Sequence, residues 1–232
     1  MDGISEAARQ GAIASRPHLI MLCLILLAIA AAGYLSLGRG GAGGALPTGA
    51  AIYLPLLAAE WGLFLYVRTG VRKRGHSIRA LVSARPLGAR TLLVDLLLAA
   101  LLLLLLWAAD LLLGRVLPDA PSGSVQALLV RRAADVPLWL LLSLSAGFVE
   151  EICFRGYLQR QLGALLAGPW LGVAAQALLF GISHGYQGPV PILRITIIGF
   201  AFGAMALLRR SLVPGIVAHA AMDVLGGLSA FR

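Results

Sequence analysis

Residues 91–113 read TLLVDLLLAALLLLLLWAADLLL, a mostly apolar run with an aspartate toward each end. At about 1.5 Å of rise per residue, a helix of this length crosses the roughly 30 Å hydrocarbon core of a bilayer. The rest of the chain is similarly apolar: of 232 residues, 59% are hydrophobic and 12% are charged, and the mean hydropathy is +0.89. A soluble domain of this length needs far more polar surface. The composition therefore predicts an all-α, polytopic integral membrane bundle that forms one compact unit.

About seven apolar runs meet the length criterion for transmembrane helices. Besides residues 91–113, the predicted spans are His18–Leu37, Ala50–Val67, a run that begins at Pro137, Trp170–His184, Val190–Leu208 and Leu212–Leu228. They divide the chain into an N-terminal segment (residues 1–17), N-terminal helices (residues 18–113) and a C-terminal core (residues 137–232).

The connector of residues 68–90 predicts the orientation in the membrane, because it is strongly basic and holds no acidic residue. Its cations are Arg68, Arg72, Lys73, Arg74, Arg79, Arg85 and Arg90. The positive-inside rule places this connector in the cytoplasm, and the N-terminal segment with it. We expect a multi-pass protein of the bacterial cytoplasmic membrane whose first span is retained. The net charge of +9 then indicates attraction to anionic lipid headgroups rather than nucleic-acid binding.

Ionisable side chains inside the predicted spans mark the candidate site, because such groups cost several kcal/mol in a bilayer and usually face a cavity or a partner. They gather in the C-terminal core, as Glu150, Glu151, Arg155, His184, His219 and Asp223. Asp95 and Asp110 lie near the ends of an earlier span and are expected to be structural, whereas Glu60 is expected to help line a shared interior. Both cysteines, Cys23 and Cys153, lie in predicted spans, so no disulfide framework is implied.

Helical spacing separates the two adjacent glutamates. Glu151 and Arg155 are four residues apart in the order that favours an ion pair on one helix face. Glu150 is rotated by about 100° and needs a partner on another helix, or a proton. His219 and Asp223 are also four residues apart.

Depth in the membrane indicates that these groups meet. Counting the rise from the predicted span ends places Glu150, His184 and His219 within about two helical turns of one another. One intramembrane site is therefore predicted. Because Glu150 comes out roughly 10 Å from the cytoplasmic boundary, the site is expected to open toward the cytoplasm.

Three short motifs carry a resemblance to a known family. EEICFR (150–155), FGISH (180–184) and HAAMD (219–223) follow one another in the order and rough spacing of the EExxxR, FxxxH and HxxxN or HxxxD motifs of the CPBP intramembrane proteases. That family includes the type II CAAX prenyl proteases and the bacteriocin-immunity, or Abi, proteins. The resemblance covers about the last hundred residues and implies an intramembrane endopeptidase acting on membrane-associated proteins or peptides.

The resemblance also implies roles for individual residues. Glu150 corresponds to the glutamate that activates the attacking water, and His184 and His219 correspond to the histidines that orient the water and stabilise the oxyanion. Glu151 and Arg155 correspond to supporting residues. Phe180 is expected to pack beside the site.

Asp223 departs from the asparagine that often ends the third motif. Asparagine donates hydrogen bonds to an oxyanion, whereas an ionised aspartate only accepts them, so Asp223 is expected to orient His219 or to carry a proton. Glu150, His184, His219 and Asp223 could together bind a divalent metal such as zinc, as the metalloprotease label of the family suggests. The zincin motif HExxH is absent, however, and a glutamate–histidine site also works without metal. Both alternatives stay open.

Two other functions use the same residues. A proton-coupled transporter could use the acid–histidine cluster, but such proteins often have repeated halves, which we do not find. A non-catalytic immunity or scaffold protein could keep the fold without the activity, although every expected catalytic position is filled. Cys153 is disfavoured as a nucleophile, because apolar surroundings keep a thiol protonated.

Overall fold

The computed structural model describes residues 12–37, 49–86, 88–118 and 122–229. Within these residues the chain is helical apart from its connections and one isolated antiparallel β-bridge between Ser83 and Ser211. The long helices are α2 (Arg16–Leu37), α3 (Ala50–Arg72), α5 (Ala89–Val116), α7 (Val136–Glu150), α9 (Pro169–Ser183), α10 (Pro189–Arg209) and α11 (Val213–Leu228). The short elements are α4 (Ile78–Val82), α6 (Gly123–Leu128), α8 (Gln159–Leu165), the 3₁₀ turns η1 (Ala133–Asp135) and η3 (Gly185–Gln187), and the π-helix η2 (Glu151–Leu158).

The predicted all-α class is observed, but the count of about seven spans is not confirmed. Five stretches are long and apolar enough to cross a membrane: Arg16–Leu35, Ala50–Arg72, Ala89–Val116, Ala133–Leu165 and Pro189–Arg209. The other two predicted spans are α9 and α11, which have 15 and 16 residues and are shorter than a typical span. Both begin with a proline in the first turn, where a missing N–H costs nothing, so each starts abruptly after a connection.

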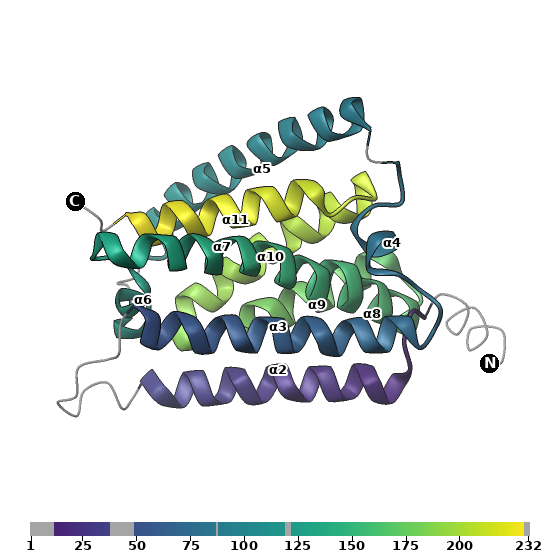
Figure 1. Cartoon of the computed structure of the whole chain (residues 1–232), viewed down its shortest axis with the longest axis horizontal. Helices are drawn as coiled ribbons and strands as arrows, with labels where there is room; N and C mark the ends of the chain where they lie inside the picture. The colour runs from purple at the N-terminus through teal and green to yellow at the C-terminus, as the bar shows by residue number, and fades with distance from the viewer. Residues whose placement is uncertain (1–11, 38–48, 87, 119–121, 230–232) are drawn as a thin grey trace.

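The long helices lie side by side along the long axis of the molecule (Figure 1). Helix α7 packs against α3 and α11, α11 also packs against α5, and α9 packs against α10. The fourth span is the longest, because α7 continues without a break through η2 into α8. This arrangement puts η2 at the middle of the bundle.

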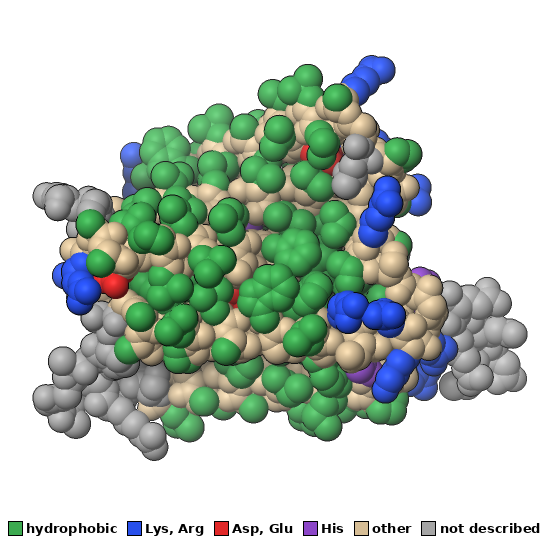
Figure 2. All heavy atoms as spheres, in the orientation of Figure 1, with side chains coloured by type: hydrophobic (Ala, Val, Ile, Leu, Met, Phe, Trp, Pro, Cys, Tyr) green, Lys and Arg blue, Asp and Glu red, His purple; other side chains and the backbone are tan. Residues whose placement is uncertain are grey.

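The two ends of the bundle differ in charge. The end with α4 and α8, which we call the basic end, carries Arg16, Arg72, Lys73, Arg74, Arg79, Arg85, Arg90, Arg160, Arg209 and Arg210. Figure 2 shows most of the Lys and Arg side chains of the visible face at this end. The end with α6 and η3, which we call the opposite end, carries Arg115, Arg131, Arg132 and Arg194 together with Asp110 and Asp135.

Buried apolar side chains fill the interior toward the basic end. Val67, Leu81, Tyr157, Leu158 and Leu212 are each at most 2% exposed and belong to one cluster. Backbone hydrogen bonds between Leu212 N and Val82 O, and between Ala84 N and Arg210 O, hold the α4 connector against the start of α11. The basic end is thus closed by packed side chains beneath α4.

Candidate active site

The two adjacent glutamates lie where α7 changes into the π-helix η2. Glu150 is the last residue of α7, and Glu151 is the first of η2. A π-helical turn inside a longer helix is rare and frequently marks a functional site. Here it places two carboxylates of one helix in two different environments.

Glu151 lies in a closed polar cluster. Its Oε1 is 2.8 Å from Nη1 of Arg155, and both side chains are fully buried. This is the ion pair expected from their spacing. The same Oε1 is 3.1 Å from Nδ1 of His219, a contact between residues 68 positions apart that the sequence did not suggest. Helix α11 comes this close because residue 215 is a glycine: a Cβ there would lie 2.7 Å from Oε2 of Glu151.

Aromatic rings and a carbonyl hold the Arg155 guanidinium. It lies 4.2 Å from the ring centre of Phe180 and 5.1 Å from that of Phe202. Its Nη2 donates to the carbonyl of Gly199 at 3.3 Å. Cation–π contacts of this kind are strongest when the cation is desolvated. Phe180 therefore packs at the site, against Arg155.

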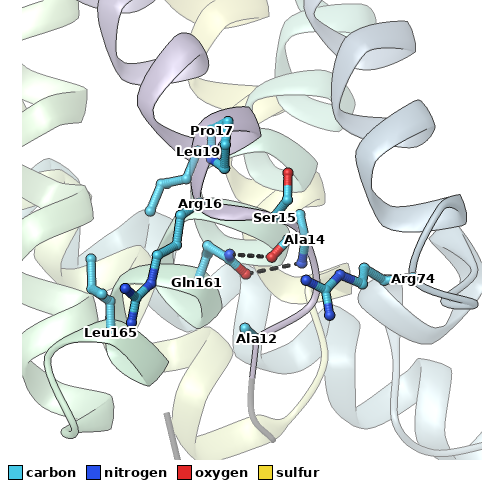
Figure 3. Close-up of a pocket in the computed structure, with 9 residues that line it drawn as sticks. All are labelled: Ala12, Ala14, Ser15, Arg16, Pro17, Leu19, Arg74, Gln161 and Leu165. Atoms are coloured by element: carbon cyan, nitrogen blue, oxygen red, sulfur yellow. Dashed lines mark hydrogen bonds between the residues drawn. The ribbon is translucent and has the colours of Figure 1, made fainter. Parts of the chain in front are cut away.

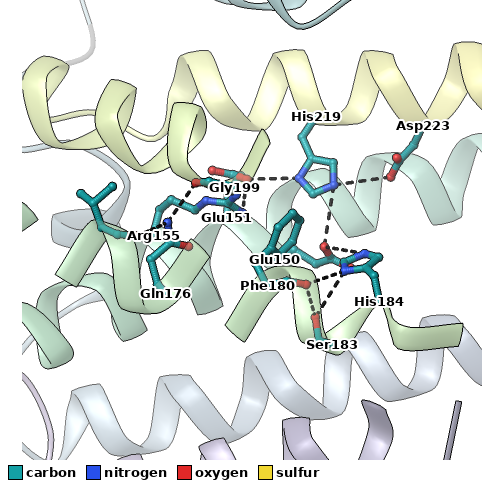
Figure 4. Close-up of polar contacts among 11 residues, drawn as sticks. Glu150, Glu151, Arg155, Gln176, Phe180, Ser183, His184, Gly199, His219 and Asp223 are labelled. Carbon is teal, nitrogen blue, oxygen red and sulfur yellow. Dashed lines mark hydrogen bonds and ion pairs between the residues drawn. The ribbon is translucent and has the colours of Figure 1, made fainter. Parts of the chain in front are cut away.

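His219 stands between the two glutamates (Figure 4). Its Nδ1 faces Glu151, while its Nε2 is 3.7 Å from Oε2 of Glu150 and 3.8 Å from Oδ2 of Asp223. The ring stacks on Phe202 with the centres 5.6 Å apart. Because the Glu151 carboxylate already pairs with Arg155, Nδ1–H of His219 acts as the donor to it, and Nε2 is turned toward Glu150 and Asp223.

His184 approaches Glu150 from another helix end. It follows the last residue of α9, and its Nδ1 donates to the carbonyl of Phe180 at 2.8 Å, since a carbonyl only accepts. This bond directs Nε2 toward Oε2 of Glu150, 4.0 Å away. The separations of Glu150 from His184 and His219 are too long for direct hydrogen bonds and suit a bridging water.

Glu150 Oε2 is buried and accepts no hydrogen bond from the protein within the described residues. Its residue nevertheless lines a cavity of about 540 Å³, together with His184, His219 and Asp223. Glu60 of α3 lines the same cavity, as expected of that residue. The remaining wall is mainly apolar, with contributions from α2, α3, α6, α7, η3 and α11. Glu150 is thus an unpaired acceptor at the wall of a largely apolar cavity.

The expectation that the site opens toward the basic connector is wrong. The described residues that line the cavity continue from Glu150 to Val125 and Leu128 of α6, Tyr186 of η3 and Gly227 of α11, all at the opposite end. The depth count placed the charged residues correctly with respect to one another. It carried no information about which half of the interior the apolar side chains fill.

The two earlier aspartates are structural, as expected, but their surroundings differ. Asp95 is fully buried, pairs with Nε of Arg209 and accepts from Oγ of Ser211 at 2.9 Å. It ties α5 to the connection between α10 and α11. Asp110 is exposed and lies 3.5 Å from Nη1 of Arg194. Neither residue is among those that line the cavity.

The side chains as they lie do not fit a metal ion. In the described part of the chain, no group of three or more His, Cys, Asp or Glu side chains is arranged to hold one. Glu151, which would complete such a set with His219, has an oxygen shared by Arg155 and the histidine ring. We therefore derive no chemical step through a metal.

A second cavity, of about 390 Å³, lies at the basic end (Figure 3). The side chains of Arg16 and Arg74 line it, together with that of Gln161. The buried Gln161 amide accepts from the backbone N–H groups of Ile13 and Ala14 and donates to the carbonyl of Ala14 at 2.7 Å. The described residues around this cavity include no carboxylate or histidine, so it lacks the groups of a hydrolytic site.

Comparison with known proteins gives one match. Residues 132–225 match the family model described as type II CAAX prenyl endopeptidase Rce1-like. No curated protein and no solved structure matched the chain. The matched stretch contains the π-helix, both histidines of the cavity and Asp223.

Proposed function

Because residues 132–225 form an Rce1-like domain of the type II CAAX prenyl endopeptidase family, we propose that this protein is an intramembrane endopeptidase in which Glu150 activates water. The observation that carries the mechanism is the position of Glu150. Its Oε2 is unpaired within the protein, faces the cavity and lies within 4.0 Å of two histidine nitrogens.

Glu150 is suited to act as the general base. A water between Oε2 of Glu150 and the two histidines would lose a proton to the carboxylate as its oxygen attacks the scissile carbonyl carbon. The C–N bond of the tetrahedral intermediate then breaks, and the same proton passes from Glu150 to the leaving amine. Acid, base and water are held on three separate helices, so their positions depend on the packing of the whole core.

The histidines are suited to stabilise the negative charge on the attacked oxygen. The Nδ1 atoms of both rings are occupied, by Phe180 O in His184 and by Glu151 in His219. Each protonated ring would then donate from Nε2 to the oxyanion. Glu151 and Arg155 act through His219: they fix its ring orientation and make no contact with the cavity water.

Cleavage of membrane-tethered reporter peptides by the purified protein in detergent tests this proposal. The comparison includes wild type, Glu150→Gln, His219→Ala and the matched control Asp110→Asn, which removes an exposed carboxylate outside the cavity. We expect wild type and Asp110→Asn to cleave alike and Glu150→Gln to lose about 10²–10⁴-fold in rate. A parallel series with a chelator reads out metal dependence. Cleavage by Glu150→Gln at the wild-type rate would sink the mechanism.

A further inference from the structure

The catalytic cavity reaches only one end of the bundle. Beyond Glu150, the described residues that line it follow α11 through Met222 and Gly226 to Ser229, and the facing wall reaches Leu129 just after α6. None of the described lining residues belongs to α4, to α8 or to the connection between α10 and α11. The cavity is therefore open to the opposite end and not to the basic end.

Packed side chains block the other direction. On the basic side of Glu150, the interior is occupied by Tyr157 and Leu158, both fully buried, and by Leu81 and Leu212 at 1% and 2% exposure. The hydroxyl of Tyr157 lies 2.7 Å from Nδ1 of His18, which joins η2 to the first turn of α2. A polypeptide could reach Glu150 from the basic end only by displacing this core.

The charges indicate which membrane face each end meets. At the opposite end, Arg132 lies 3.6 Å from Asp135, and Arg194 lies 3.5 Å from Asp110, so part of the positive charge is neutralised. The residues of the connector at the basic end are all cationic or neutral between positions 68 and 90. Positive charge flanking spans is retained in the cytoplasm. The opposite end is therefore the extracytoplasmic one.

We propose that substrates enter the catalytic cavity from the extracytoplasmic face, at the mouth formed by α6, η3 and the end of α11. The partner that fits is a polypeptide segment whose scissile bond is presented from that side of the bilayer. The apolar wall suits an uncharged stretch of such a segment, with its backbone carbonyl directed at Glu150. The substrate assignment rests on the proposed peptidase activity, whereas the direction of access rests on the cavity alone.

Cysteine labelling in sealed vesicles of known orientation tests the direction of access without any need for cleavage. Met222→Cys places a thiol in the cavity wall, and Leu225→Cys places one on the same helix at a side chain that is 62% exposed and outside the cavity. Gly88→Cys marks the basic end, where an added Cβ meets no atom within 4 Å. Wild type, with its two native cysteines, gives the background. The reagent is a membrane-impermeant maleimide.

We expect the maleimide to label Met222→Cys from the extracytoplasmic face at least tenfold faster than Leu225→Cys, and to label Gly88→Cys from the cytoplasmic face only. Labelling of Met222→Cys from the face that labels Gly88→Cys overturns the proposal. So does labelling only after detergent treatment, or labelling no faster than that of Leu225→Cys. Failure of the peptidase proposal is recognised separately, as correct labelling by a protein that cleaves no reporter.

Discussion

Glu150 and Glu151 are neighbours in the chain, but the fold gives them different tasks. Glu151 is fully buried and shares one oxygen between Arg155 and His219, whereas Glu150 faces the cavity with an oxygen that no protein group contacts by a hydrogen bond in the described residues. A buried charge that has lost its partner is costly, while an unpaired acceptor at a cavity wall is available to water. The two positions should therefore respond differently to the same substitution.

We expect Glu151→Gln to lower stability and Glu150→Gln to leave it nearly unchanged. Removing one partner of a buried ion pair costs about 3–5 kcal/mol, because the other charge stays buried. The midpoint of thermal unfolding in detergent measures the difference. The double variant Glu151→Gln/Arg155→Met should recover part of the loss, since it removes both charges. Equal midpoints for the two single variants would contradict this assignment.

Asp223 tests the departure from the family motif. Its Oδ2 is 3.8 Å from Nε2 of His219, too far for a direct hydrogen bond, and it lines the cavity. If its task is to bind water or the reacting group, an amide of the same shape retains it. We expect Asp223→Asn to keep cleavage within about tenfold of wild type and Asp223→Ala to lose about 10²–10³-fold. Reporter cleavage at matched protein concentration measures both; an asparagine variant as slow as the alanine variant means that the negative charge is essential.

Sequence spacing predicted the local part of this site and not the part made between helices. The Glu151–Arg155 pair was accessible because four residues on one helix define a face. The contact of Glu151 with His219 joins η2 to α11, and no periodicity within one segment specifies it. The nearest signal was Gly215, but a glycine in a helix is compatible with many kinds of close approach.

At the scale of elements, small residues set the distance between α7 and α11. A Cβ at Gly147 would lie 2.8 Å from both the backbone nitrogen and the Cβ of Ala220, so the two helices touch at this point. Ala220 is next to His219, and Gly147 is one turn before Glu150 and Glu151. The contact therefore fixes the separation between the histidine and the glutamates.

Gly147→Ala should destabilise the bundle and slow cleavage. The added methyl meets backbone, which cannot move aside as a flexible side chain would, and overpacking of this kind costs about 1–3 kcal/mol. Gly62→Ala is the matched control: it also lies inside a helix, but an added Cβ there meets no atom within 4 Å. Alanine favours a helix over glycine by up to about 1 kcal/mol, so the control should be neutral or stabilising. Thermal midpoints of the two variants, measured side by side, decide the matter; a loss of similar size in both would mean that the close contact is not responsible.

The helices were predictable where the apolar run was continuous. The predicted span Ala50–Val67 corresponds to α3, Ala50–Arg72, and the predicted span from Val190 to Leu208 corresponds to α10, Pro189–Arg209. The extent of the fourth span was less accessible, because charged residues interrupt its pattern although the helix continues to Leu165. Its π-helical turn leaves no mark in a hydrophobicity pattern.

At the scale of the whole molecule, the bundle is solid at one end and hollow at the other. The sequence predicted a shared depth for the charged residues, since rise per residue converts directly into distance. It did not predict the direction of opening, which depends on where side chains from α2, α3 and α4 pack. Leu81 of α4 and Leu128 of α6 represent the two ends: the first is 1% exposed in the main core cluster, and the second lines the cavity.

The same truncation at these two leucines should therefore have opposite consequences. Leu81→Ala creates a void in a closed core and should cost about 2–5 kcal/mol of stability, with cleavage per folded molecule unchanged. Leu128→Ala removes a contact from the cavity wall and should leave the unfolding midpoint nearly unchanged, while kcat/KM for an apolar reporter falls by about three- to tenfold. Thermal unfolding and reporter kinetics on both variants give four values. If Leu128→Ala is the more destabilised variant, or if Leu81→Ala is the one with altered kcat/KM, then the two ends do not divide stability and substrate binding between them as the packing of this bundle requires.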